Sequence, residues 1–276
     1  MNNLLVRTLS GAFFVAVVVG AFLWGLLPTV ILLGIFVGIG LSEFYLLFQR
    51  DNSSFVNKFA GIFFGLLIYV GVSGNQLEWW SISTLFYLAP IFFLPFLGML
   101  FSKKKEPIKA ISLQYLSWIY VVLPFLLMIQ IYKFGGHDDS WIYIIGLFVV
   151  VWSNDSFAYL TGRAFGKTKL FERISPKKTW EGTIGGVVMA VLVSIIYAHF
   201  VDQNYQFWAI SALLIAPAAV LGDLIESKIK RTAGVKDSGS IMPGHGGVLD
   251  RFDAVIFATP FYFFWISIAV KELNFL

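Results

Sequence analysis

The sequence has no cysteine, only three histidines and few charged residues, since 13% of its 276 residues are Asp, Glu, Lys or Arg. Without cysteine there is no disulfide framework and no thiolate chemistry. Soluble domains carry about 25% charged residues, so the low charge argues against an ordinary soluble protein. No internal repeat, low-complexity tract or soluble domain is visible along the chain.

Hydrophobic residues take the place of the missing charge. They make up 58% of the chain and come in runs of about twenty, the length that crosses a hydrocarbon core of about 30 Å. We therefore predict an all-α, polytopic integral membrane protein with about nine transmembrane helices. The predicted spans lie near residues 8–26, 28–48, 59–74, 82–101, 112–132, 141–161, 183–201, 206–226 and 254–271.

Lysine and arginine positions predict the orientation. With the N-terminus in the cytoplasm, eighteen of the twenty Lys and Arg residues fall on the inner side, and only Lys133 and Lys271 fall outside. Positive charge concentrates in cytoplasmic loops of membrane proteins. The sequence therefore predicts a cytoplasmic N-terminus and an external C-terminus, and the regular alternation supports nine spans.

We divide the chain into an N-terminal region of five spans, residues 1–132, and a C-terminal catalytic region of four spans, residues 133–276. The second region contains the two longest polar segments, the inner loops 162–182 and 227–253. Both loops are richer in Gly, Pro and charge than the rest of the chain. Any chemistry is therefore expected in these loops, on the cytoplasmic side.

The eighth span ends in a polar stripe. Asp223, Glu226, Ser227 and Lys230 follow each other at helical spacing, so they share one face of a helix. Asp223 lies about a turn inside the apolar run, where a carboxylate is costly unless it is paired, hydrated or bound to a metal. The alternative is a helix end that dips into the interface and leaves Asp223 simply hydrated.

A glycine-rich segment follows the stripe. Gly246 and Gly247 give a backbone that can approach a ligand closely, and successive amides in such a loop can bind an anion. Asp250 and Asp253 stand three residues apart at the start of the ninth span, where acidic residues also serve as ordinary helix caps. His245 is either a hydrogen-bonded loop anchor or a direct substrate contact, and without Cys or a second clustered His a zinc site is not expected.

The carboxylates of the two segments suggest a cation site. Mg²⁺ takes one or two protein carboxylates together with phosphate oxygens, so Asp223, Asp250 and Asp253 form a candidate metal cradle. Lys236, Arg251 and the glycine amides are candidate phosphate contacts, with Asp237 as a further charged neighbour.

The other inner loop contains Lys177, Lys178, Thr179 and Glu181. Its first part is one residue short of a Walker A motif and follows a membrane helix, so we reject a P-loop. Inner lysines often serve only topology or lipid headgroups, but that does not explain why Thr179 and Glu181 follow directly. Three further intramembrane polar residues are candidates by default: Asn154, Asp155 and, ranked lower, Glu43, which could equally pair with a neighbouring helix.

These residues resemble the signature of the phosphatidate cytidylyltransferases, also called CDP-diacylglycerol synthases. The resemblance is also seen in segment 175–182 and at Asp155 with Arg163, and its main part comprises Ser227, Lys230, Arg231, Lys236, Asp237, Gly239, Pro243, His245, Gly246, Gly247, Asp250, Arg251 and Asp253. It covers at least residues 154–260, whereas the earlier spans agree only in number and length.

The resemblance implies an enzyme that transfers CMP from CTP to phosphatidic acid, with Mg²⁺ and a second cation, K⁺. It implies a homodimer in the cytoplasmic (inner) membrane of a bacterium, with the active site on the cytoplasmic side and no nucleic-acid partner. The expected catalytic residues are Asp223, Asp250, Asp253, Lys236 and Arg251, with the three aspartates as metal ligands. The expected nucleotide and phosphate contacts are Lys177, Lys178, Thr179, Glu181, Arg163, Lys230, Arg231, His245, Gly246 and Gly247, with Asp155, Asn154, Asp237 and Ser227 as further candidates.

Two other functions remain open at this point. A CTP-dependent lipid kinase would instead transfer the γ-phosphate of CTP, giving CDP and a phospholipid. A transporter of an anionic solute is disfavoured, because transporters often show repeated halves and a site near the bilayer midplane, whereas this chain has no repeat and gathers its charge at the inner face.

Overall fold

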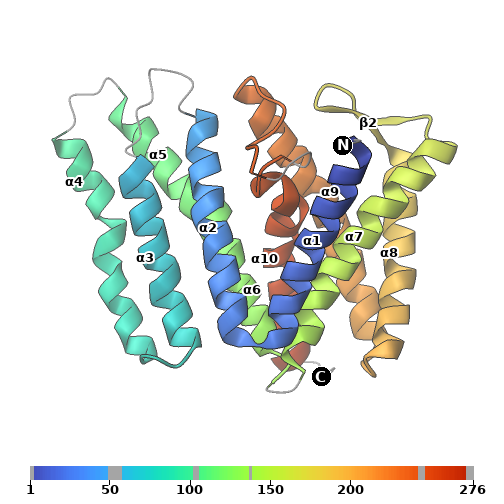
Figure 1. The fold of residues 1–276 in the computed structure, drawn as a ribbon, viewed down its shortest axis with the longest axis horizontal. Helices are drawn as coiled ribbons and strands as arrows, with labels where there is room; N and C mark the ends of the chain where they lie inside the picture. The colour runs from blue at the N-terminus through green and yellow to red at the C-terminus, as the bar shows by residue number, and fades with distance from the viewer. Residues whose placement is uncertain (1–2, 49–57, 102–105, 137–138, 242–245, 272–276) are drawn as a thin grey trace. The chain divides into compact units, whose positions relative to one another are not determined.

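The computed structural model describes residues 3–48, 58–101, 106–136, 139–241 and 246–271. The protein is an all-α, multi-pass membrane protein with one small hairpin of strands (Figure 1). Within the described residues, eight helical segments are long and apolar enough to cross a membrane, and each coincides with a predicted span. The remaining predicted span is also helical, but its apolar part, Thr8–Trp24, is shorter.

The chain forms two compact units. The first unit comprises Met1–Gln130 and Ala233–Arg251, and the second comprises Ile131–Thr232 and Phe252–Leu276. The glycine-rich segment is therefore grouped by its contacts with the first five spans. The predicted boundary between residues 132 and 133 separates the spans that we expect to carry catalysis from those that we do not, and it stays a prediction.

Helices of the first unit pack through glycines and aromatic side chains. Trp118 Nε1 donates to the Gly61 carbonyl at 3.1 Å, and Tyr69 Oη donates to the Val30 carbonyl at 2.7 Å. Glycines let the helix backbones approach closely, as is typical of membrane helix interfaces. The elements are α1 (Asn3–Trp24), α2 (Leu26–Phe48), α3 (Lys58–Gln76), the 3₁₀ helix η1 (Ile82–Phe92), α4 (Leu94–Leu100), α5 (Pro107–Ser117), the π-helical turn η2 (Trp118–Val122) and α6 (Leu123–Lys133).

Two spans of this unit are not regular α-helices, and prolines explain both. Pro90 lies inside η1 and Pro95 lies at the start of α4, and each removes a backbone donor from the helix. The π-helical turn Trp118–Val122 ends two residues before Pro124 of α6. Local helical adjustments of this kind satisfy the backbone groups that a proline leaves without a partner.

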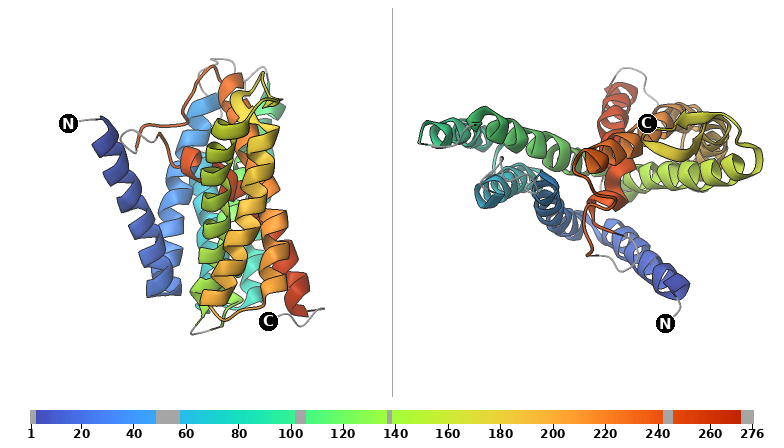
Figure 2. Two further views of the ribbon diagram at one scale, coloured as in Figure 1. Left: turned by 90° about the vertical axis from the view of Figure 1, so that its right-hand side faces the viewer. Right: turned by 90° about the horizontal axis from the view of Figure 1, so that it is seen from above.

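The second unit consists of α7 (Ser140–Phe165), β1 (Lys169–Phe171), β2 (Ser175–Thr179), α8 (Trp180–Phe200), α9 (Tyr205–Thr232) and α10 (Leu249–Lys271), which begins in the first unit. Helices α7 and α8 run side by side (Figures 1 and 2). A Cβ at Gly182 would lie 2.7 Å from the Ala158 carbonyl, and one at Gly186 would lie 2.8 Å from the Ala158 Cβ. These small residues let α7 and α8 pack closely, and the close packing sets the position of the start of α8 relative to the polar residues of α7.

The hairpin and two helix extensions were not expected from the sequence. β1 and β2 pair antiparallel, with Lys169 opposite Thr179, inside the predicted loop 162–182. Helix α7 continues to Phe165 and α9 to Thr232, so Arg163, Lys230 and Arg231 are helical rather than in loops. The helices continue past the ends of the apolar runs, and the basic side chains on these extensions are therefore arranged at helical spacing.

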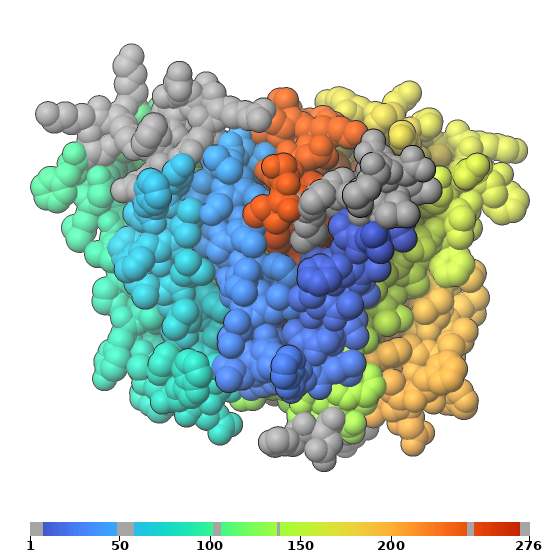
Figure 3. All heavy atoms as spheres, in the orientation of Figure 1, coloured from blue at the N-terminus to red at the C-terminus, as the bar shows by residue number. Residues whose placement is uncertain are grey.

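The outer surface of the first unit is apolar, as a lipid environment requires. Ile31 and Ile35 of α2 are 56% and 53% exposed, and Phe63 of α3 is 58% exposed, on helices visible in Figure 3. Exposed apolar patches of this kind mark contact with a membrane or a partner. Together with the helix lengths, they fit a chain embedded in a bilayer.

Candidate functional site

Two carboxylates organise the glycine-rich segment within the first unit. Glu43 of α2 is buried and accepts hydrogen bonds from the amides of Val248 and Leu249, both at 2.9 Å, and from the Ser238 hydroxyl at 3.2 Å. Asp250 is also buried, and its Oδ2 accepts from the amides of Ser238 and Gly247, both at 2.8 Å. Carboxylate oxygens therefore hold the glycine-rich segment at Ser238 and again at Gly247–Leu249.

The contacts of these carboxylates resemble helix capping at the start of α10. Asp250 reaches back three residues to the Gly247 amide, as the acidic residue of a capping box does. Gly247 has no side chain to complete the box, and a Cβ there would overlap the Glu43 carboxyl group. Glu43, more than 200 residues away, supplies the acceptor that a local capping side chain would give.

Three other candidates of this segment lie at the surface. Lys236, Asp237 and Arg251 are exposed. Gly246 has a φ of 83°, a conformation that favours glycine, and a Cβ there would lie 2.5 Å from Asp250 Oδ2. His245 lies outside the described residues.

In the second unit, carboxylates pair with lysines instead. Lys178 Nζ lies 2.7 Å from Asp223 Oδ2, and the Ser227 hydroxyl donates to Asp223 Oδ1 at 3.1 Å. Both charged side chains are partly exposed, at 25% and 34%. The polar stripe predicted on the eighth span is thus present, with Asp223 in contact with a lysine from the hairpin.

A second ion pair lies one turn further along α9. Lys230 Nζ lies 2.6 Å from Oε2 of Glu226, whose side chain is almost fully buried. Asp253 of α10 interacts electrostatically with Asp223, Glu226 and, more weakly, Asp155, so each of these three carboxylates lies within electrostatic range of Asp253. We call Asp223, Glu226, Asp253 and Asp155 the acidic cluster. Arg163 and Arg231 are exposed.

The hairpin is anchored by two residues that we expected to bind nucleotide. Thr179 caps α8, because its hydroxyl accepts from the Gly182 amide at 3.2 Å. Glu181 accepts from the amides of Lys167 and Thr168, each at 3.1 Å. Both residues therefore support the loop, and a nucleotide contact by either stays a prediction.

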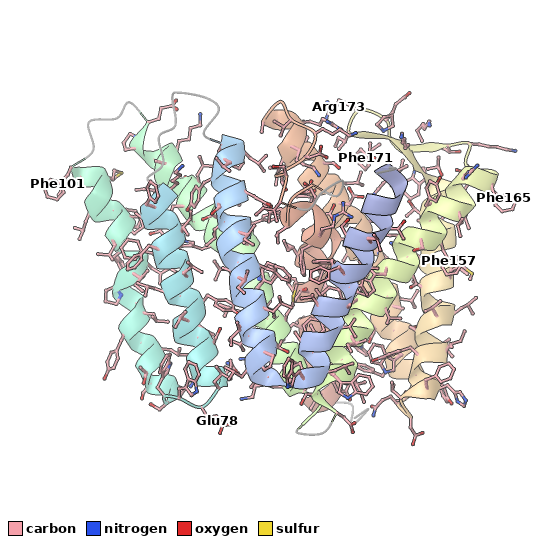
Figure 4. All side chains as sticks on the ribbon, in the orientation of Figure 1. Glu78, Phe101, Phe157, Phe165, Phe171 and Arg173 are labelled. Carbon is pink, nitrogen blue, oxygen red and sulfur yellow. The ribbon has the colours of Figure 1, made fainter. Side chains whose placement is uncertain are left out.

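The two neighbouring lysines of β2 differ in their surroundings. Successive side chains of a strand point to opposite faces. Lys178 meets Asp223, whereas Lys177 is exposed. Figure 4 shows α7 running from Phe157 to Phe165 toward the hairpin end of this unit, where Phe171 and Arg173 also lie. The sequence alone gave no reason to separate the two lysines.

Asn154 and Asp155 differ in the same way. Asn154 is fully buried, and its Nδ2 donates to Asp155 Oδ1 at 3.3 Å. Its Oδ1 accepts no hydrogen bond from the described residues. Asp155 is exposed and contributes its charge to the acidic cluster.

The donor chemistry of the acidic cluster fits Mg²⁺, which binds one or two carboxylates and completes its shell with substrate oxygens. Among the described residues, no set of three or more Asp, Glu or His is arranged to hold a metal ion. Two carboxylates, Asp223 and Asp253, are within electrostatic range. Asp250 belongs to the first unit, so its sharing of one cation with Asp223 stays a prediction.

Glu43 is the residue that sequence reasoning valued too little. Its signal was a carboxylate inside an apolar run, the same signal that singled out Asp223. What the sequence could not supply was the partner, because Glu43 meets amides 205 and 206 residues further along the chain.

Comparison with known proteins shows the family of this chain. The chain matches the model of the cytidylyltransferase family over residues 5–269. It is 35% identical to a phosphatidate cytidylyltransferase of Staphylococcus aureus over 257 residues, which cover 92% of this chain and 96% of that protein. It is also 35% identical over 237 residues to one of Haemophilus influenzae, covering 75% and 78% of the two chains. The chain, with its membrane helices, amide-bound carboxylates and lysine-paired carboxylates, thus belongs to the cytidylyltransferase family.

Proposed function

We propose that the protein transfers CMP from CTP to phosphatidic acid, giving CDP-diacylglycerol and pyrophosphate. The observation that carries this proposal is the likeness to named phosphatidate cytidylyltransferases along 92% of the chain. A membrane fold suits a lipid substrate, and a lysine-rich hairpin suits a triphosphate.

The reaction joins two anions. A phosphate oxygen of phosphatidate attacks the α-phosphorus of CTP, the new P–O bond forms, and the bond to the β-phosphate oxygen breaks with release of pyrophosphate. The nucleophile is already charged, so no strong general base is needed. Two unit charges at 4 Å repel by about 4 kcal/mol at an effective dielectric constant of 20, and cationic side chains must offset that repulsion.

The lysines of the second unit are suited to that task. Lys178 and Lys230 already contact carboxylates, so their ammonium groups are held near the acidic cluster. An incoming triphosphate can take over the Lys178 ammonium from Asp223, which leaves an aspartate oxygen available to a cation. We assign Lys177, Arg163 and Arg231, which are exposed, to the approach of the phosphates.

We propose Mg²⁺ as the cofactor, with Asp223 and Asp253 as its ligands and Asp250 as a third. When bound, the ion would stabilise the negative charge that develops on the pyrophosphate. The protein's own contribution is to hold the Asp223 and Asp253 carboxylates within electrostatic range of each other on α9 and α10. A second cation, K⁺, and a homodimer complete the proposal.

Labelled substrate tests the reaction. Purified protein is incubated with phosphatidate, Mg²⁺ and CTP labelled either at the α- or at the γ-phosphate. The proposed reaction moves the α-label into the lipid phase and leaves the γ-label in pyrophosphate. Transfer of the γ-label to lipid would replace it with a CTP-dependent kinase, and anion flux into proteoliposomes without CTP use would indicate a transporter.

We also propose that the enzyme lies in the bacterial inner membrane with its N-terminus and active site in the cytoplasm. The support is the distribution of Lys and Arg, because with the nine predicted spans eighteen of the twenty fall in segments on one side. Reporter fusions at the two ends should place them on opposite sides of the membrane. Both ends on the same side would contradict the nine-span topology.

A further inference from the structure

Glu43 is a buried charge that the proposed reaction does not use. It lies in α2, 3% exposed, and both of its carboxylate oxygens accept hydrogen bonds from the same short stretch of chain. Oε1 accepts from the Val248 amide, while Oε2 accepts from the Leu249 amide and the Ser238 hydroxyl. Burying a carboxylate is costly, and two backbone amides, together with a hydroxyl that Glu43 shares with Asp250, offset that cost.

Two glycines of the glycine-rich segment leave room for the Glu43 carboxyl group. A Cβ at Gly239 would lie 2.5 Å from Glu43 Oε1, and a Cβ at Gly247 would overlap both oxygens. Gly246 has a positive φ, but Gly247 does not, so Gly247 is needed for space rather than for its backbone conformation. The two glycines thus keep open the volume that the Glu43 side chain fills.

The amides that Glu43 binds lie at the beginning of α10. The first amides of a helix have no partner within the helix, and a negative charge beside them is favourable. The next two residues are Asp250 and Arg251, both of which we assign to catalysis. A group that fixes Val248 and Leu249 therefore also fixes the direction from which these two side chains leave the helix.

We propose that Glu43 is a positioning residue, a latch on α2 that holds Ser238 and the pair Val248–Leu249 and thereby orients Asp250 and Arg251 for the nucleotide. The part that concerns catalysis rests on the proposed function. The part that concerns the order of the segment does not.

A carboxylate is required at this position, because both oxygens act as acceptors. In Glu43→Gln the side chain keeps its shape, but the amide nitrogen is a donor and must face an N–H or O–H donor. One hydrogen bond is then replaced by a repulsive contact, which costs more than a simple loss. Glu78→Gln is the matched control, since it removes one carboxylate of the same unit in the turn between α3 and η1 (Figure 4).

The absence of cysteine allows a readout that does not depend on activity. Ser240 is exposed, so a spin label on Ser240→Cys reports the mobility of the segment. We expect the label to be ordered in the parent and in Glu43→Gln to become clearly more mobile, with no change in Glu78→Gln. An equally ordered label in Glu43→Gln would overturn the latch.

Kinetics test the catalytic part. In Glu43→Gln, kcat/KM for CTP should fall by about tenfold or more, while KM for phosphatidate changes by less than about twofold. A mobile label with unchanged kinetics would remove the positioning role. If no variant, including the parent, makes CDP-diacylglycerol, the proposed function fails, and the spin-label result still decides whether Glu43 holds the segment.

A second-site change keeps the test decisive if Glu43→Gln does not fold. Gly247→Ser adds a capping hydroxyl in the space that Glu43→Ala vacates, so Glu43→Ala/Gly247→Ser should recover order and activity relative to Glu43→Ala. Gly247→Ala in the parent should displace the Glu43 carboxyl and mobilise the label, although Glu43 is still present. A harmless Gly247→Ala, or a double variant no better than Glu43→Ala, would contradict the proposal.

Discussion

Buried or half-buried carboxylates occur in both units, but they have different partners. In the first unit, Glu43 and Asp250 accept hydrogen bonds from backbone amides and a serine hydroxyl. In the second, Asp223 and Glu226 pair with the ammonium groups of Lys178 and Lys230. A backbone amide cannot leave its acceptor unless the chain moves, whereas a lysine can swing away on a flexible stem.

The difference separates a fixed part of the site from an exchangeable part. Carboxylates bound to amides hold a segment in one conformation, and replacing them disturbs structure first. Carboxylates bound to lysines can exchange one cation for another, and replacing them disturbs chemistry first. The predictions below test that contrast.

The largest effect is expected for Asp223→Asn, which keeps the shape of the side chain and removes its charge. Turnover should fall by at least about a hundredfold, because a metal ligand close to the reacting phosphates is lost. The measurement is CDP-diacylglycerol formation at saturating substrates, with elution as a folded, monodisperse protein as the control. Near-normal turnover at limiting Mg²⁺ would make Asp223 a hydrated helix-end residue.

Added Mg²⁺ distinguishes the aspartates from one another. Asp253→Asn keeps Asp223 and should recover part of its activity when Mg²⁺ is raised. The double variant Asp223→Asn/Asp250→Asn should not recover. Equal recovery in both would contradict the shared roles that we assign to Asp223 and Asp250.

A smaller effect is expected at β2. Lys178→Ala should raise the KM for CTP by about tenfold, because an ammonium near the triphosphate is lost, while Lys177→Ala, exposed on the other face, should change it less. Steady-state kinetics at saturating phosphatidate measure both values. A KM unchanged in both variants would return these lysines to topology or lipid-headgroup roles.

The smallest effect concerns the cap of α8. Thr179→Ala removes the acceptor of the Gly182 amide and should lower the free energy of unfolding by about 1 kcal/mol. Thr232→Ala is the matched control, since its hydroxyl donates only to a carbonyl in the last turn of α9. Thermal unfolding in detergent compares the two. Equal stability of both variants would show that Thr179 does not act through the cap.

The spans were predictable because hydropathy is a local property. The hydrophobic runs coincide with the eight long helices, and even the irregular span starting at Ile82 was located. The ends of helices were less predictable. Helix α9 continues six residues beyond the predicted end at 226. Hydropathy marks where the apolar run ends, whereas the polar residues that follow still form a helix.

The candidate site was predictable in its residue types but not in its pairings. The stripe from Asp223 to Lys230 follows from helical spacing, and Glu226–Lys230 is an i,i+4 pair. The contact of Lys178 with Asp223 and that of Glu43 with Leu249 depend on tertiary packing. For that reason Glu43 and Asp223, which look alike in the sequence, have different surroundings in the structure.

Binding of Mn²⁺ in place of Mg²⁺, followed by electron paramagnetic resonance without nucleotide, tests the central contrast most directly. If the Lys178 ammonium occupies a cation's place beside Asp223, Lys178→Ala should bind Mn²⁺ about fivefold more tightly than the parent, as expected for the loss of a competing, partly exposed ion pair. Asp223→Asn should bind Mn²⁺ more weakly than the parent, and Glu43→Gln, which keeps all three aspartates, should weaken binding by less than Asp223→Asn does. Weaker or unchanged binding in Lys178→Ala, or a loss in Glu43→Gln as large as that in Asp223→Asn, would contradict the division into a fixed and an exchangeable part.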